Sequence, residues 1–310
     1  MTLALLFPGQ GSQYVGMGRD LAAAFPEAAR VFEEADDLLG FSLSGLCWEG
    51  PEDELTLTRN AQPALLTHSV AAYRVVRDRL GPVAFAAGHS LGEFSAHVAA
   101  GTLTFADALG AVRRRGELMF EAGEARPGSM AAMLGLDDAD VERVCAAASR
   151  EESVCVPANY NAPGQVVVSG DVAAVERAGD LAREAGARRV VPLNVSGAFH
   201  SPLMAPAEAG LAEHLAGIDF ADPVYPVVSN VTAAPVRSGE EARTLLVRQL
   251  TSAVRWSQSI TALVEAGVDR FVELGAGSVL CGLNRRNARG VPCASVGAPD
   301  DLQALEEGEA

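Results

Sequence analysis

The sequence predicts an α/β fold with a largely parallel sheet, into which a smaller ferredoxin-like subdomain is inserted. Short β-type apolar runs alternate with longer helical patterns, which is typical of a parallel sheet covered by helices. Between residues 128 and 196 the expected order changes to β-α-β-β-α-β, the order of the ferredoxin-like motif. The 310 residues are 49% hydrophobic, which is enough for a large core and a smaller second one.

The expected elements of the larger part begin and end at recognisable turn residues. A buried strand over Thr2 to Phe7 is broken by Pro8-Gly9, and the next helix has apolar positions at 21, 24 and 25. Gly101 favours the left-handed conformation that closes helices. The other expected elements are helices over Pro63 to Arg79, Leu91 to Ala100 and from Thr104 (with Asp107 in its first turn) through RRRGELM, and strands over Val83 to Ala87, near Val224 to Val228 and over Arg270 to Leu274.

The inserted subdomain is expected between two hinges, Arg126-Pro127-Gly128 and Ser196-Gly197. Its strands are expected over 129–136, 154–160, 164–170 and 188–195, and its helices over Asp138 to Ala148 and Val172 to Ala185. The predicted division is a large domain of residues 1–127 and 197–297 and a subdomain of residues 128–196. Residues 298–310 form an acidic tail without apolar periodicity after Leu305, and we expect it to be loosely held.

Composition excludes several classes of partner. The formal net charge of -16 argues against nucleic acid and anionic membrane surfaces. The five cysteines are odd in number and include no C-x-x-C pair, so we expect free thiols in a reducing compartment, with no disulfide framework and no zinc site. The first apolar run stops at Phe7, too early for a signal peptide or a membrane span. We therefore expect a soluble, cytoplasmic protein, and nothing in the sequence requires more than a monomer.

Ser90 lies in a sequence that is typical of an exposed serine nucleophile. Gly88-His89-Ser90-Leu91-Gly92 matches G-x-S-x-G, after an expected strand and before an expected helix. In that setting the turn is strained, the glycines leave room for it, and the hydroxyl stands at the positive end of the helix. The Leu91 N–H would then face a developing oxyanion. The alternative is a structural turn, because so short a pattern also arises by chance.

A serine nucleophile needs a base, and the chain has five histidines. His200 lies in a loop of small residues, NVSGAFHSPLM, from which an imidazole is able to reach a serine on another element. His89 is next to the serine and should point away from its hydroxyl, and His97 lies two turns along the same helix. His68 is expected to serve packing and His214 to be solvated. His200 is therefore the candidate base.

A second glycine-rich turn, FPGQGSQ, closes the first strand. It lacks the Lys-Ser/Thr ending of a phosphate-binding loop, so it does not predict nucleotide binding. A turn at the carboxyl end of a strand presents backbone N–H groups to a neighbouring site. The Gln10 N–H is therefore a candidate second oxyanion donor, and an ordinary strand-to-helix turn is the alternative.

Several ordered motifs together resemble the malonyl-CoA:acyl-carrier-protein transacylase family, which supplies extender units to fatty-acid and polyketide synthases. Three motifs are central, FPGQGSQYVGMG, GHSLGEFSA and VSGAFHSPLM, and the others are QPALLTHSVA, RRRGELM, NYNAPGQVVVSG, RWSQSI and ELGAGSVLCGL. The similarity covers roughly residues 3–297, and one departure is Ala276, where the family usually has proline. The resemblance implies a hydrolase-like α/β core with the ferredoxin-like insert.

The resemblance also implies a two-step, ping-pong reaction. Ser90 would attack the malonyl thioester with His200 as base, while the amides of Gln10 and Leu91 hold the oxyanion. CoA would leave, and the phosphopantetheine thiol of an acyl carrier protein would take the malonyl group from the serine ester. No carboxylate completes a triad in this family, and the carbonyl that orients the histidine corresponds to Gln249. No metal and no cofactor are expected, since malonyl-CoA is a substrate and the phosphopantetheine belongs to the partner.

Two further residues correspond to positions that select the substrate. Arg115, in RRRGELM, matches the family's arginine, whose planar guanidinium grips the malonyl carboxylate, whereas Arg113 and Arg114 are expected to form an exposed basic face. Phe199 resembles the malonyl-selective polyketide acyltransferases, because its ring would crowd a C2 methyl group. The alternative for Phe199 is core packing.

The leading function is a free-standing malonyl transacylase of fatty-acid synthesis or, as GAFHS slightly favours, of polyketide synthesis. One alternative is a hydrolase that clears acyl chains from carrier proteins, which would have no use for Arg115, and another is a non-catalytic docking module. Carrier proteins are acidic and this chain carries -16, so docking needs a local cationic patch. The candidates are Arg188-Arg189 and Arg285-Arg286 with Arg289, and Asn159 and Asn161 resemble residues that line the family's substrate channel.

Overall fold

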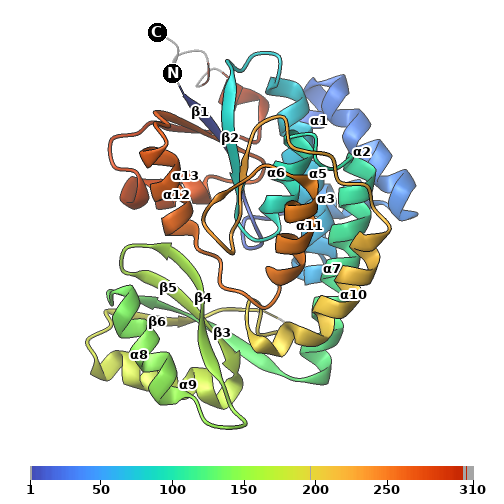
Figure 1. Cartoon of the computed structure of the whole chain (residues 1–310). Helices are drawn as coiled ribbons and strands as arrows, with labels where there is room; N and C mark the ends of the chain where they lie inside the picture. Colours follow the sequence, from blue (N-terminus) through green and yellow to red (C-terminus); the bar gives the residue numbers. More distant parts are fainter. Residues whose placement is uncertain (1, 196, 303–304, 306–310) are drawn as a thin grey trace.

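The computed structural model describes residues 2–195, 197–302 and 305, and its larger sheet is mostly parallel, as predicted (Figure 1). The strand order is β10-β9-β1-β2-β7-β8. Every neighbouring pair in this order is parallel except β7 with β8. The strands are β1 Leu3–Phe7, β2 Val83–Gly88, β7 Val227–Val228, β8 Pro235–Val236, β9 Arg270–Leu274 and β10 Cys293–Val296.

Strand β1 is the centre of this sheet and is buried on both faces. Its residues LALLF are all buried, as expected for a parallel strand between two layers of helices. Leu5 and Phe7 belong to the main apolar core, while Ala4 and Leu6 belong to the core on the opposite face. Phe7 is paired with Gly88 at the ends of β1 and β2. The two glycine-rich turns that follow these strands are therefore neighbours.

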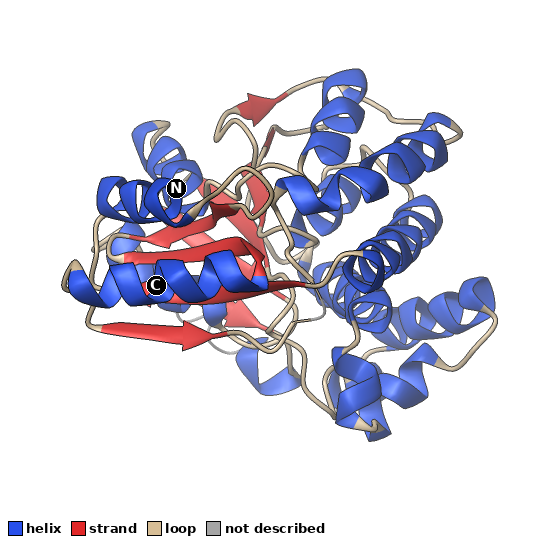
Figure 2. Cartoon of the chain, turned by 90° about the horizontal axis from the view of Figure 1, so that it is seen from below, coloured by secondary structure: helices blue, strands red, loops and turns tan. Residues whose placement is uncertain are grey.

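Helices cover both faces of the larger sheet (Figures 1 and 2). They are α1 Arg19–Ala24, α2 Pro26–Leu39, α3 Leu43–Glu49, α4 Glu52–Thr56, α5 Thr58–Val76, α6 Gly92–Ala99, α7 Phe105–Ala125, α10 Ala205–Ala216, α11 Gly239–Arg248, α12 Trp256–Glu265 and α13 Val279–Asn287, with 3₁₀ turns at Pro202–Met204 and Pro299–Asp301. As expected, α7 follows Thr104, whose side chain accepts a hydrogen bond from the Asp107 N–H.

Helix α5 begins at Thr58, so the prediction that it begins at Pro63 was wrong. A proline inside a helix leaves the carbonyl four residues earlier without its N–H partner. Here that carbonyl belongs to Arg59, and it accepts a hydrogen bond of 3.0 Å from Arg113 Nη1. The side chain of Arg113 is therefore tied into the structure, and the expectation that it only forms an exposed basic face was also wrong.

The smaller sheet has the ferredoxin-like arrangement that the sequence predicts. Its strands are β3 Gly128–Leu134, β4 Cys155–Ala162, β5 Gln165–Asp171 and β6 Arg189–Pro192, in the antiparallel order β4-β5-β3-β6. Helices α8 Asp138–Ala148 and α9 Val172–Glu184 cover one face of it and enclose a separate apolar core (Figure 1). The opposite face is turned toward the larger sheet.

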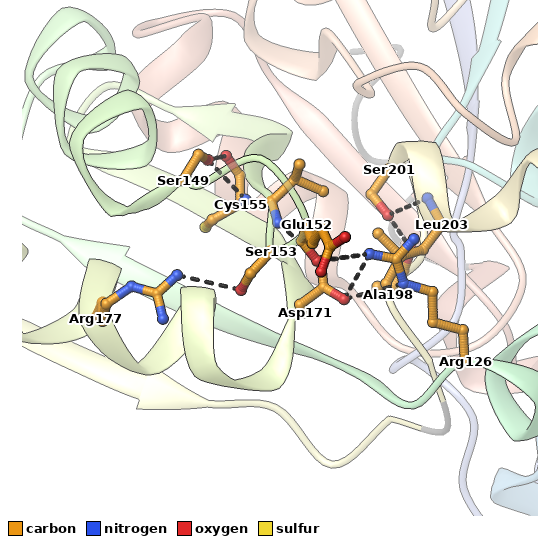
Figure 3. A network of polar contacts seen from close by, with 11 residues as sticks. Arg126, Ser149, Glu152, Ser153, Cys155, Asp171, Arg177, Ala198, Ser201 and Leu203 are labelled. Atoms are coloured by element: carbon orange, nitrogen blue, oxygen red, sulfur yellow. Dashed lines mark hydrogen bonds and ion pairs between the residues drawn. The ribbon is translucent and has the colours of Figure 1, made fainter.

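An arginine fixes the junction where the chain enters the smaller sheet (Figure 3). Arg126 donates from Nε and Nη2 to the Asp171 carboxylate at 2.8–3.0 Å, and the Val154 N–H donates to the same carboxylate at 2.8 Å. Gly128 leaves no room for a side chain, because a Cβ there would lie 2.5 Å from the Ala198 Cβ. The second expected hinge includes Ser196, which lies outside the described residues. The division into 1–127 with 197–297 and 128–196 therefore stays a prediction.

The cysteines correct one expectation. Cys281 of α13 and Cys293 of β10 form a disulfide, with their Cα atoms 5.4 Å apart, while Cys47, Cys145 and Cys155 are buried and free. The expectation of free thiols throughout was wrong because this pairing depends on the chain returning from α13 alongside the sheet. Local spacing of the cysteines carries no sign of that return.

The first residues of the acidic tail are packed, so the expectation of a loose tail was wrong for them. The Asp301 carboxylate accepts hydrogen bonds of 2.9 Å from the Gly297 N–H and 2.8 Å from the Ala298 N–H. Leu302 and Leu305 are buried in the main core. Residues 303–304 and 306–310 lie outside the described residues. In the part of the chain that is described, no helix combines the length and the apolar character that crossing a membrane requires.

Truncating the central strand should cost far more stability than the same truncation on the surface. We expect Leu5→Ala to lower the free energy of unfolding by about 2–5 kcal/mol, because Leu5 is fully buried. The matched control is Leu38→Ala in α2, where the side chain is 52% exposed and the expected change is within about 0.5 kcal/mol. Denaturant unfolding of both variants measures this, and equal losses would contradict the packing described.

Candidate active site

Ser90 stands on a strained turn between β2 and α6. Its φ is 52°, in the left-handed region that non-glycine residues rarely adopt. A Cβ at Gly88 would lie 1.9 Å from the backbone of Gly92, and a Cβ at Gly92 would lie 2.1 Å from the carbonyl oxygen of Phe7. Neither position has room for a side chain, so both must be glycine. The strand–turn–helix setting that the sequence predicts is present.

His200 reaches Ser90 from the loop before α10. Its Nε2 lies 2.8 Å from Ser90 Oγ, and its Nδ1 lies 2.9 Å from the backbone oxygen of Gln249. Because that oxygen only accepts, Nδ1 carries the hydrogen and Nε2 is left to accept from the serine. Ser201 holds the loop by donating to the Ala198 carbonyl at 2.7 Å and accepting from a backbone N–H of the following 3₁₀ turn (Figure 3).

Among the described residues, no other histidine has a hydrogen bond with the Ser90 hydroxyl. His89 Nε2 lies 2.8 Å from Asn161 Oδ1, and His68 Nε2 lies 2.9 Å from the Gly297 oxygen. His97 is fully buried in α6. His214 is half-buried, with an Nε2 that has no hydrogen-bond partner among the described residues, so the expectation that it is solvated was wrong.

Arg115 is a buried cation at the bottom of the site, with only 1% of its surface exposed. Its Nη1 donates to Gln62 Oε1 at 2.7 Å, and its Nη2 donates to Gln249 Oε1 at 2.9 Å and to Ser90 Oγ at 3.2 Å. In the described part of the chain no carboxylate lies within ion-pair distance of it, and its Nε has no partner. A buried guanidinium without an adjacent anion is suited to receive a carboxylate.

Burial also sets the protonation of the base. Burial, together with the positive charge of Arg115, lowers the pKa of His200 to about 3. Burial lowers the pKa of Arg115 to about 10, with Glu93 acting in the opposite direction. At neutral pH the imidazole is therefore neutral and the guanidinium charged. Those are the states that a general base and a carboxylate-binding group require.

The two expected oxyanion donors lie side by side. The turns that carry Gln10 and Leu91 touch, since a Cβ at Gly9 would lie 2.4 Å from the carbonyl oxygen of His89. Gln10 and Leu91 line the same cavity as Ser90. Neither backbone N–H has a hydrogen-bond acceptor among the residues that the structure describes. Both amides are therefore available to a ligand atom next to the serine hydroxyl.

The site opens into a cavity of about 390 Å³ between the two sheets. Met130 of β3 and Val167 of β5 contribute apolar side chains from the smaller sheet, and Asn159 and Asn161 of β4 contribute polar ones. Phe199 lines the same cavity and is 6% exposed, which fits both of its expected roles, selectivity and packing. A second cavity of about 640 Å³ adjoins this one and includes the exposed acidic residues Glu52 and Asp53.

Four groups of the site escaped the sequence analysis. Gln62 and Glu93 lie inside the motifs QPALLTHSVA and GHSLGEFSA, which predict no separate role for either residue. For Gln249 only the backbone carbonyl was expected to act. Asn230 Oδ1 accepts the Ser90 N–H at 2.6 Å, and its Nδ2 donates to the Gly88 carbonyl at 2.7 Å. No local signal marks Asn230, because it reaches the turn from a loop 140 residues further along the chain. Within the described residues, no cluster of His, Cys, Asp and Glu is suited to hold a metal ion.

Comparison with known proteins agrees with this geometry. The model of the acyl transferase domain family matches residues 4–304. The malonyl CoA-acyl carrier protein transacylase of Bacillus subtilis is 46% identical, over 97% of this chain and 95% of the relative. That of Escherichia coli is also 46% identical, over 98% of both chains.

This chain belongs to that family of acyltransferases. A malonyl-transacylase solved in complex with a type II PKS acyl-carrier protein shares its fold with a TM-score of 0.95 and 44% identity, over 99% of this chain and all of that one. An acyl carrier protein S-malonyltransferase from Vibrio cholerae gives 0.95 and 42%, over 98% of this chain and all of that one. The acyltransferase is thus an enzyme with the fold that the resemblance implied, and the transacylase interpretation is favoured over a hydrolase or a docking module.

Adding a methyl group at Gly92 in the serine turn should damage this acyltransferase, whereas the same change at Gly282 in α13 should not. We expect Gly92→Ala to lower the free energy of unfolding by about 1–3 kcal/mol, since its Cβ would overlap the Phe7 carbonyl. Acylation of Ser90 should slow by about 100-fold, because α6 and the serine must shift. In the control, Gly282→Ala, the Cβ has no atom within 4 Å, and stability should rise by up to about 1 kcal/mol. Thermal melting and acylation rates measure both, and an undisturbed Gly92→Ala would contradict the geometry.

Proposed function

We propose that this acyltransferase moves a malonyl group from malonyl-CoA to the phosphopantetheine thiol of an acyl carrier protein through an ester on Ser90. One observation carries the proposal: Ser90 Oγ lies 2.8 Å from the His200 imidazole and 3.2 Å from a buried guanidinium, that of Arg115. A base at the hydroxyl activates the serine as a nucleophile for acyl transfer. A cation beside the hydroxyl favours an acyl group that carries its own carboxylate.

In the first half-reaction, Ser90 Oγ attacks the thioester carbonyl while His200 Nε2 takes its proton. The negative charge on the carbonyl oxygen rests on the N–H groups of Gln10 and Leu91. The Gln249 carbonyl holds Nδ1–H of the imidazole and stabilises the imidazolium that forms. The C–S bond then breaks, the CoA sulfur receives the proton from His200 Nε2, and the malonyl-Ser90 ester remains.

The second half-reaction repeats these steps with the carrier's thiol as the nucleophile. His200 takes the thiol proton, the sulfur attacks the ester carbonyl, and the proton returns to Ser90 Oγ as the C–O bond breaks. Water would compete for the ester, and a buried site between two sheets limits its access. Arg115 holds the malonyl carboxylate throughout, so the acyl carbon stays next to the oxyanion donors. A cytoplasmic location and independence from a cofactor stay predictions of the sequence.

The nucleophile and the carboxylate site are testable by intact-protein mass spectrometry. After brief mixing with malonyl-CoA we expect one malonyl adduct, absent from Ser90→Ala. We expect Arg115→Ala to acylate at least 30-fold more slowly, the equivalent of about 2 kcal/mol for a buried carboxylate that loses its charged partner. The matched control is Arg114→Ala, because Arg114 is 40% exposed on the same helix and should leave the rate unchanged.

Acetyl-CoA and methylmalonyl-CoA complete that experiment. Acetyl-CoA should give no adduct, because it has no carboxylate for Arg115 to bind. Methylmalonyl-CoA should load more slowly than malonyl-CoA if the Phe199 ring crowds a C2 methyl group. Equal loading of acetyl and malonyl groups, or release of CoA without an adduct, would return the hydrolase to consideration.

A basic cluster at the edge of the cavity is the proposed docking surface for the acidic carrier protein. Arg285 is exposed on α13, and Arg289 is exposed two residues after that helix ends. Arg286 of α13 donates to Gln165 Oε1, a residue that lines the cavity. Gln165, Leu134 and Arg189 lie opposite one another across β5, β3 and β6. Arg188-Arg189 therefore lies about 10 Å further along the same edge.

Charge reversal at this surface distinguishes binding of the carrier protein from the acyl-transfer chemistry. We expect Arg285→Glu with Arg286→Glu to raise KM for the carrier protein roughly tenfold and to leave malonyl loading from CoA unchanged. The control is Arg143→Glu on α8 with Arg183→Glu on α9, two exposed arginines whose reversal changes the net charge by the same amount as the first variant. Steady-state kinetics at low salt measures both. Unchanged carrier kinetics in the first variant would exclude this surface.

A further inference from the structure

A carboxylate that the mechanism above does not use is buried beneath the catalytic serine. Glu93 lies in the first turn of α6, three residues after Ser90, and its side chain is fully buried. Its Oε2 accepts hydrogen bonds from Gln249 Nε2 at 2.7 Å and from the Asn230 N–H at 3.0 Å. Its Oε1 has no partner among the described residues. A buried glutamate so sparsely partnered is costly, which raises the question of what it does.

Gln249 connects this carboxylate to the substrate arginine. The Gln249 Nε2 donates to Glu93 and to the Ser90 carbonyl, at 2.7 and 3.1 Å, while its Oε1 accepts from Arg115 Nη2 at 2.9 Å. The Gln249 amide thus lies between the Glu93 carboxylate and the Arg115 guanidinium. Its NH₂ group faces the negative charge and its oxygen faces the positive charge, which fixes the orientation of the amide. The same residue's backbone oxygen orients His200. Gln249 therefore links Glu93 to both the carboxylate-binding group and the base.

Asn230 connects the same carboxylate to the nucleophile turn. Glu93 holds the backbone N–H of Asn230, whose side chain in turn bonds the Ser90 N–H and the Gly88 carbonyl at 2.6 and 2.7 Å. Both Asn230 and Gln249 are fully buried. The groups of Gln249 and Asn230 that bind Glu93 are donors, and the Ser229 hydroxyl also favours the charged carboxylate. An acceptor without a proton therefore satisfies them best.

We propose that Glu93 is a positioning residue: its carboxylate, acting through Gln249, holds Arg115 in place while leaving the guanidinium free for the malonyl carboxylate. A direct ion pair between Glu93 and Arg115 would occupy the binding group and set the substrate's carboxylate against an internal competitor. The intervening amide lets the negative charge orient the cation without occupying it. This inference rests on the proposed function, because it assumes that Arg115 binds the carboxylate of the acyl group.

The proposal gives a pH dependence with a definite sign. Burial raises the pKa of Glu93 to about 7, and its hydrogen bonds and the charge of Arg115 oppose that rise. Arg115 on α7 is the charged group that acts on it, and the neighbouring imidazoles of His89 and His200 have pKa values lowered by burial. As pH falls through about 7, Glu93 gains a proton, and its hydrogen bond with Gln249 Nε2 weakens. Acylation by malonyl-CoA should therefore fall below pH 7, well above the titration of His200.

The test is a double-mutant cycle on single-turnover acylation of the full chain by malonyl-CoA, followed by mass spectrometry from seconds to hours. Glu93→Gln, of the same size but uncharged, should be acylated about 10- to 100-fold more slowly at pH 8. Its acylation rate should also no longer fall as the pH drops through about 7, the change called here the pH limb. In an Arg115→Ala background the same change should cost less than about twofold, because its effect passes through Arg115. Glu93→Asp keeps the charge and should recover part of the rate.

The control is Glu273→Gln, the removal of a second buried carboxylate. Glu273 is fully buried in β9, its pKa is also raised to about 7 by burial, and it accepts hydrogen bonds from two N–H groups of α13. It has no contact with Arg115 or Gln249 among the described residues. This variant should keep both the acylation rate and the pH limb, even if its melting temperature changes.

Several outcomes would overturn the proposal. They are an unchanged or faster acylation rate in Glu93→Gln, an equal loss in the Arg115→Ala background, and a limb near pH 7 that persists without Glu93. If Glu93→Gln does not fold, the pH profile of the unaltered protein decides, since a flat rate between pH 8 and 5.5 excludes the role. Failure of the proposed function differs from all of these, because the unaltered protein would then form no malonyl-Ser90 ester.

Discussion

The site depends on one electrostatic constraint, a guanidinium held inside the protein without an adjacent anion. Arg115 is 1% exposed, and neutral oxygens of Gln62, Gln249 and Ser90 surround it. Neutral acceptors orient the side chain without cancelling its charge, so a carboxylate that enters the cavity gains an interaction no protein group already makes. Burial, assisted by the charge of Arg115, keeps His200 neutral at the serine and so able to accept a proton.

The larger sheet brings the reacting groups together by its register. β1 and β2 are parallel and end at the same level, with Phe7 opposite Gly88, so the turns that carry Gln10 and Ser90 are in contact. Carboxyl ends of adjacent parallel strands are a common position for ligand sites. The loops that carry His200, Asn230 and Gln249 then close around the serine from later parts of the chain. The smaller sheet adds the opposite wall of the cavity.

Strain and buried polar groups concentrate at this site and are supported by its surroundings. Ser90 and His200 both have positive φ, at 52° and 56°. Ser90 donates its N–H to Asn230 Oδ1, and its carbonyl accepts from Gln249 Nε2. His200 Nδ1 donates to the Gln249 carbonyl, and these hydrogen bonds to buried residues support both strained conformations. Among the described residues the other non-glycine residue with positive φ is Ala233, at 53°, which lies three residues after Asn230. Backbone strain is therefore found at the two residues proposed to react and close to one that supports them.

The sequence by itself determined the α/β class, the ferredoxin-like order of the insert and the serine turn, because each follows from local periodicity or from a short motif with strict spatial needs. The helix start at Thr58, the disulfide of Cys281 with Cys293 and the packed Leu302 and Leu305 were decided only by tertiary structure. In each case a partner distant in the chain supplies what the local sequence lacks. The roles of the Asn230 and Gln249 side chains belong with these. A hydrogen bond across more than a hundred residues leaves no periodic trace, and only the folded chain brings its two ends together.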